Sequence, residues 1–142
     1  MTFPASLKSL QTELIDARRG YEEALKDATD GDIAEIFRQM IGLRTDAITQ
    51  IHGALAAEGH PDDEHGSVMS LVHRTVVGVR AAVSGLGPDS LPGFVDGETR
   101  ILLSYNSAID ECRPYPKIAN LLEGQRAALA DMVAKMKRFA ST

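Results

Sequence analysis

Apolar residues recur every three or four positions along almost the whole chain. This spacing places them on one face of an α-helix, whereas a half-buried strand requires apolar residues at every second position. Glycine and proline interrupt the pattern at residues 30–32, 58–61, 84–88 and 113–116, and such residues end helices or form turns. No segment shows sustained alternation, so the sequence predicts an all-α protein.

The breaks divide the chain into five predicted helices, at about residues 4–28, 32–58, 67–84, 90–112 and 115–139. Four of them are long and amphipathic, which favours a four-helix bundle. The shorter helix at 67–84 lies in the long connection between the second and third bundle helices. A crossover of this length would leave those two helices parallel, as in ferritin-like bundles. A simple up-down bundle with the short helix packed outside is the alternative. We predict a single domain over residues 1–142.

The composition of the chain excludes several functional classes of protein. The chain has 142 residues and a net charge of −5, with 15 Lys and Arg against 20 Asp and Glu. An acidic chain is a poor match for the basic surface that nucleic acids require. No apolar run approaches the roughly 18 residues of a membrane span, and the N-terminus lacks the pattern of a secretory signal. One cysteine, Cys112, cannot form an internal disulfide. We expect a cytoplasmic protein that binds neither nucleic acid nor membrane.

Each long helix carries a hydrogen-bonding residue near the middle of its apolar face. Arg44 follows Met40 by four residues and precedes Ile48 by four, and Glu22 follows Ile15 by seven. An unpaired buried charge costs several kcal/mol, so we expect these groups to contact one another. The guanidinium can bind both carboxylates and the amide can complete the set. The sequence predicts one buried polar layer, formed by Glu22, Arg44, Glu98 and Gln125.

Di-iron proteins of the ferritin-like fold place one Glu on each of two helices and Glu-x-x-His on each of the other two. Glu22 and Glu98 occupy the positions of the single glutamates, but the other two positions read Arg44-x-x-Ala47 and Gln125-x-x-Ala128. A guanidinium would repel a metal ion from the point where the ligands converge. We therefore predict an ion-pair network in place of the metal site, with no metal, no cofactor and no catalytic residue.

The chain resembles a bacterial family of small ferritin-like four-helix-bundle proteins of unknown function, some of whose relatives are fused to PfpI-type domains. The resemblance covers nearly the whole length. Its matching features are Gly20-x-Glu22, Phe37 with Arg44, Gly59-x-Pro61, Gly66-Ser67, His73-Arg74, Arg80-Ala81-Ala82, Gly97-Glu98 with Tyr105, and Glu123-x-Gln125. In this family an aromatic residue often follows the His-Arg pair, where this chain has Thr75-Val76-Val77. The resemblance implies the bundle fold and no reaction.

Three functions stay open at this point. The first is a non-catalytic bundle, a stress-associated or interaction module that self-associates through a helical face. The second is a di-metal (iron or manganese) carboxylate oxidase or metal-storage protein with an irregular site, which requires the Arg44 side chain to leave the core. Its ligands would be Glu22 and Glu98, joined by Glu35, Asp46, Glu123 or a histidine. The third is a binder of an unknown small molecule, in a pocket near Gly20 and Gly97.

Overall fold

The computed structural model describes residues 4–58 and 91–140, which form four helices and no strand. The helices are α1 (Ala5–Lys26), α2 (Gly31–Ala57), α4 (Leu91–Glu111) and α5 (Pro116–Ala140). The all-α prediction is confirmed for these residues, and each helix begins and ends within about two residues of its predicted bounds. The helix predicted at 67–84 lies outside the described residues.

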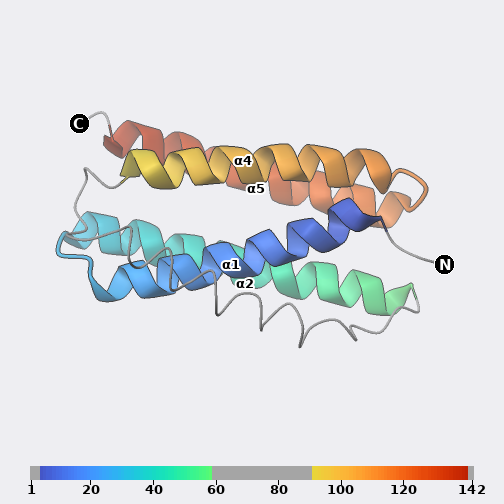
Figure 1. The fold of residues 1–142 in the computed structure, drawn as a ribbon, viewed down its shortest axis with the longest axis horizontal. Helices are drawn as coiled ribbons and strands as arrows, with labels where there is room; N and C mark the ends of the chain where they lie inside the picture. Colours follow the sequence, from blue (N-terminus) through green and yellow to red (C-terminus); the bar gives the residue numbers. More distant parts are fainter. Residues whose placement is uncertain (1–3, 59–90, 141–142) are drawn as a thin grey trace.

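The four helices pack side by side as two antiparallel hairpins, α1 with α2 and α4 with α5 (Figure 1). In addition, α1 packs against α4 and α2 packs against α5. The helices α2 and α4 therefore lie diagonally opposite each other across the bundle. In Figure 1, α2 and α4 run in the same direction. In a simple up-down bundle these two helices would run in opposite directions.

Local chemistry determines where the second helix of each hairpin begins. Asp30 is the N-cap of α2, and its side chain accepts hydrogen bonds from the backbone N–H groups of Asp32 and Ile33. These N–H groups have no partner inside the helix, which explains why Asp is favoured there. Pro116 is the first residue of α5, where its fixed φ suits the helix and its missing N–H costs nothing.

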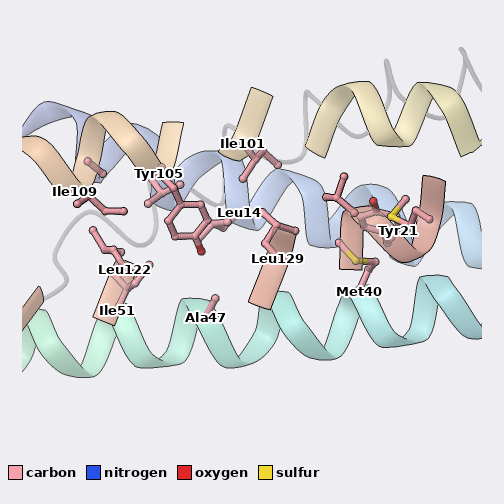
Figure 2. Close-up of a cluster of buried hydrophobic side chains, with 14 of the residues drawn as sticks. Leu14, Tyr21, Met40, Ala47, Ile51, Ile101, Tyr105, Ile109, Leu122 and Leu129 are labelled. Atoms are coloured by element: carbon pink, nitrogen blue, oxygen red, sulfur yellow. The ribbon is translucent and has the colours of Figure 1, made fainter. Parts of the chain in front are cut away.

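The core contains one buried face from each helix (Figure 2). At one level, the rings of Tyr21, Phe37 and Phe94 form a cluster with centroids 5.0 to 5.4 Å apart, within the usual range for aromatic pairs. Towards the other end the contacts are mainly aliphatic, and Ile51, Ile109 and Leu122 are among the buried residues there. The outer faces carry polar side chains, and none of the described helices is long and apolar enough to cross a membrane.

Replacing Asp30 by Ala removes the cap of α2. We expect the free energy of unfolding to fall by about 1 kcal/mol, because two backbone N–H groups lose their acceptor. Urea unfolding followed by circular dichroism measures the change. Asp30→Asn keeps an acceptor oxygen and should retain nearly all of the stability. An equal loss in both variants would contradict the capping role.

A buried polar layer as the candidate functional site

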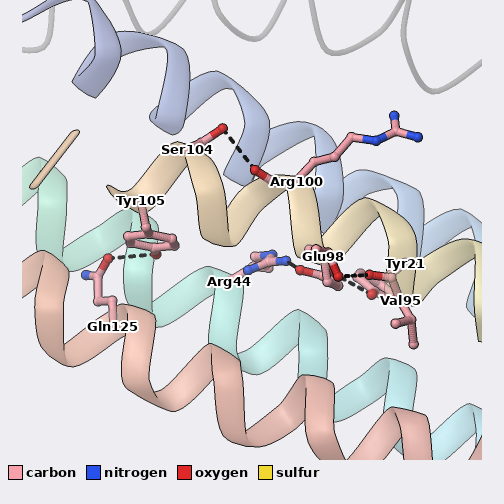
Figure 3. A network of polar contacts seen from close by, with 9 residues as sticks. Tyr21, Arg44, Val95, Glu98, Arg100, Ser104, Tyr105 and Gln125 are labelled. Atoms are coloured by element: carbon pink, nitrogen blue, oxygen red, sulfur yellow. Dashed lines mark hydrogen bonds and ion pairs between the residues drawn. The ribbon is translucent and has the colours of Figure 1, made fainter. Parts of the chain in front are cut away.

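A guanidinium and a carboxylate meet in the middle of the core. Arg44 extends inward from α2 and its Nη2 donates to Oε1 of Glu98 on α4 (Figure 3). Only 1% of Arg44 and 2% of Glu98 is exposed. Neither charge can be solvated by bulk water, so each depends on the other for compensation. The pair connects the two helices that face each other across the bundle.

A tyrosine hydroxyl forms a hydrogen bond with the second oxygen of the carboxylate. The hydroxyl of Tyr21, on α1, donates to Oε2 of Glu98 over 2.6 Å. Such a short O–H···O⁻ bond is typical of a charged acceptor. Glu98 therefore has one oxygen on the guanidinium and the other on the phenol. Three helices contribute to this half of the layer.

The second half of the layer is centred on Gln125 of α5. The hydroxyl of Tyr105 donates to its Oε1 over 3.0 Å. Its Nε2 donates to Oε1 of Gln50 over 3.0 Å and to the carbonyl oxygen of Ala47 over 3.2 Å. A side-chain amide has two donor hydrogens, and both have an acceptor here. This half connects α4, α5 and α2.

The buried setting shifts the pKa values of the layer's groups. Burial lowers the pKa of Arg44, and the neighbouring hydroxyls of Tyr21 and Tyr105 oppose that shift. An arginine nevertheless stays protonated in a protein. Burial raises the pKa of Tyr21, and it raises the pKa of Tyr105 to about 12, with Arg44 acting in the opposite direction in both cases. Both phenols are therefore neutral hydrogen-bond donors at physiological pH.

The structure places three of the four predicted residues inside and one outside. Arg44, Glu98 and Gln125 are buried, but the prediction that Glu22 is buried is wrong. Its side chain is 44% exposed and lies 3.8 Å from Nε of Arg18 on the same helix.

The error has a geometric cause in α1. Ile15, seven residues before Glu22, is buried, which suggested that both share the inner face. In the second half of α1 the buried residues are Gly20, Tyr21 and Ala24. The buried face there is therefore rotated about the helix axis, away from the side on which Ile15 lies. Glu22 lies one residue, or about 100°, beyond Tyr21 and therefore points outward.

Two tyrosines of the layer were not among the polar residues predicted from the sequence. Tyr21 and Tyr105 lie in the core, but each hydroxyl donates to a polar partner. The usable signal is that a buried tyrosine hydroxyl needs a hydrogen-bond partner, and each of these tyrosines lies on the buried face of its helix. Gln50 is exposed, and nothing in the helical pattern indicated its contact with Gln125.

Other candidates from the sequence do not join the layer. Within residues 4–58 and 91–140, no three side chains of His, Cys, Asp or Glu come close enough together to hold a metal ion. The alternative metal ligands Glu35, Asp46 and Glu123 are exposed. The histidines at 60, 65 and 73 lie outside the described residues. Cys112 is buried, and burial, followed by the charge of Glu111, raises the pKa of its thiol, which disfavours the reactive thiolate.

The two glycines named from the sequence have different surroundings. A Cβ added to Gly97 would meet no atom within 4 Å, so no other helix approaches closely at that position. Gly20 is buried on the inner face of α1.

Breaking the buried pair should cost far more than breaking the exposed one. Glu98→Gln removes the charge that compensates Arg44, and we expect the free energy of unfolding to fall by about 3–5 kcal/mol. Glu22→Gln should change it by less than about 0.5 kcal/mol, since Glu22 belongs to an exposed ion pair. Urea unfolding measures both. Similar losses in the two variants would refute the described geometry.

The pair should also show strong coupling. Arg44→Met with Glu98→Leu removes both charges and leaves neither uncompensated, so the double variant should lose much less stability than the two single variants add up to. Additive losses would contradict a direct buried contact.

Stability should decline in alkaline solution because of Tyr105. In the unfolded chain this phenol ionises near its ordinary pKa of 10.0, whereas in the fold it keeps its proton to about pH 12. The contribution is complete below pH 10.0 and is lost as the pH rises to about 12, because the unfolded state releases its proton first. Urea unfolding at a series of alkaline pH values measures the decline. Tyr105→Phe should lower stability at neutral pH and make the decline shallower; an unchanged decline would contradict this assignment.

The sequence model of one protein family matches much of this chain. The family is described as Domain of unknown function (DUF2383), and its sequence model matches residues 4–111, which include α1, α2, α4, Arg44 and Glu98. No curated protein and no solved structure matches the chain. The ferritin-like relationship and the PfpI-type fusions stay predictions. Because the match spans well over half of the 142 residues, the chain belongs to this family, whose members share a domain of unknown function.

Proposed function

We propose that this chain is a non-catalytic ferritin-like bundle, acting as a stress-associated or interaction module, in which a buried polar layer replaces the di-metal site. The observation that carries the proposal is the ion pair between Arg44 and Glu98 in the core. The irregular di-metal site considered from the sequence requires a guanidinium that leaves the core, and Arg44 is directed inward.

Electrostatics supports this reading. The guanidinium already supplies a positive charge between the helices, and a second cation beside it would be strongly repelled in a medium of low dielectric constant. Glu98 has one oxygen bound to Arg44 and the other to Tyr21. A metal ion would have to compete with Arg44 or Tyr21 for each oxygen of this carboxylate.

The chemistry of the layer also favours a structural role over catalysis. A catalytic site needs a nucleophile or base whose reactive atom is free to meet a substrate. Here the carboxylate and the amide have their hydrogen-bonding atoms engaged within the protein. Such a layer can specify which helices pair and in which register, a role that buried polar groups have in some other helical proteins.

The relative direction of two helices supports the ferritin-like part of the proposal. The helices α2 and α4 run the same way (Figure 1), as in bundles with a single long crossover. Self-association through a helical face stays a prediction of the proposal.

Metal analysis tests the proposal. Purified protein is incubated with Fe²⁺ or Mn²⁺ without oxygen, dialysed, and its metal content is measured by mass spectrometry. We expect far less than stoichiometric metal, because Arg44 occupies the place of a metal cation. The control is Glu98→Gln, which should leave any residual surface-bound metal unchanged. Stoichiometric iron or manganese in the wild type that disappears in Glu98→Gln would overturn the proposal.

A further inference from the structure

A cavity of about 430 Å³ lies between α2 and α5, next to the polar layer. Pockets for small molecules commonly have volumes of about 300–1,000 Å³. Neither Gly20 nor Gly97 lines the cavity, so it differs from the pocket considered from the sequence. Most of its wall is apolar, with contributions from Leu43, Ala47, Leu121, Ala128 and Leu129.

The inner end of the cavity has few polar atoms to offer a ligand. Arg44, Tyr105 and Gln125 line it, but the first is paired with Glu98 and the other two bond to each other. Nε of Arg44 has no hydrogen-bond partner among the described residues, but this atom is fully buried. The inner end therefore suits an apolar group, and the charge of Arg44 is already balanced.

The outer part of the cavity differs in charge. Asp46 lines it and is exposed. Within the part of the chain that the structure describes, no ion pair or hydrogen bond engages its carboxylate. Since Arg44 is balanced by Glu98, which lies outside the lining, the charge of Asp46 is the one left uncompensated among the lining residues. The exposed amide of Asn120 lies on the opposite helix, α5, and also lines the cavity.

From this arrangement we propose that the cavity binds a small amphipathic amine. Its apolar body would lie against the aliphatic wall and the ring of Tyr105, and its ammonium group would lie at the outer part, beside the carboxylate of Asp46. An apolar cleft with a few well-placed polar groups is the usual form of a small-molecule site. This binding site goes beyond the structural role of the layer and does not depend on the metal content of the protein.

Three probes of matched size test the proposal on the full chain. They are 3-phenylpropylamine, 3-phenylpropanol and 3-phenylpropanoate, which share a body and differ in head-group charge. Nuclear magnetic resonance of ¹⁵N-labelled protein follows the backbone amides of Ala47, Gly124 and Ala128. We expect the amine to shift these resonances with a Kd about threefold lower than that of the alcohol, the effect of one exposed ion pair. The carboxylate should bind most weakly.

Variants locate the two parts of the site. Asp46→Asn should weaken the amine to the affinity of the alcohol and leave the alcohol unchanged. Ala128→Leu places a larger side chain on the cavity wall and should abolish binding of both probes. Ala127→Leu is the matched control, since Ala127 is exposed on the same helix and does not line the cavity. Circular dichroism establishes that each variant is folded.

Several results would overturn the proposal. They are the absence of amide shifts around the cavity with any probe, equal binding of the amine and the alcohol by the wild type, and tightest binding of the carboxylate. Unchanged binding in Ala128→Leu would likewise place the site elsewhere. None of these results bears on the metal analysis, so the proposed function and the binding site can fail independently.

Discussion

The pairing of Arg44 with Glu98 constrains this bundle more than any other interaction. A hydrophobic contact tolerates small shifts of one helix along another, because it has little directional preference. A buried ion pair does not, since a displaced partner leaves a charge without water and without compensation. With the guanidinium on α2 and the carboxylate on α4, the two helices that face each other across the bundle must align at this level. Tyr21 adds α1 to the same point.

The layer separates two sides of the molecule with different packing. Beside Glu98, the rings of Tyr21, Phe37 and Phe94 fill the space among α1, α2 and α4. On the side of Gln125, α2 and α5 leave a cavity whose wall includes Gly124, and a Cβ added there would meet no atom within 4 Å. Gln125 spans this looser side through its bonds to Ala47 and Gln50. The same amide thus connects two helices and forms part of the cavity wall.

Much of the fold could be predicted because helix signals are local. The apolar spacing, the turn at residues 30–32 and the prolines at 114 and 116 lie within a few residues of the boundaries that they determine. Burial of Arg44, Glu98 and Gln125 followed from the same spacing, since each lies at the centre of an apolar face. Glu22 lies outside the buried face of α1, and the rotation of that helix about its axis decides which residues face the core. Spacing along one helix contains no information about that rotation, which depends on the neighbouring helices.

The sequence alone determined the helical class, the helix bounds and the presence of charged residues on apolar faces, because these depend on residue type and on a period of 3.6 residues. The tertiary structure decided which polar groups meet. Two glutamates looked equivalent in the sequence, yet one is buried against Arg44 and the other lies beside Arg18 at the surface. The hydroxyl of Tyr21 donates to Glu98 and that of Tyr105 donates to Gln125. A cavity lies between α2 and α5. These features depend on the rotation and spacing of whole helices against one another, which no single segment of the chain encodes.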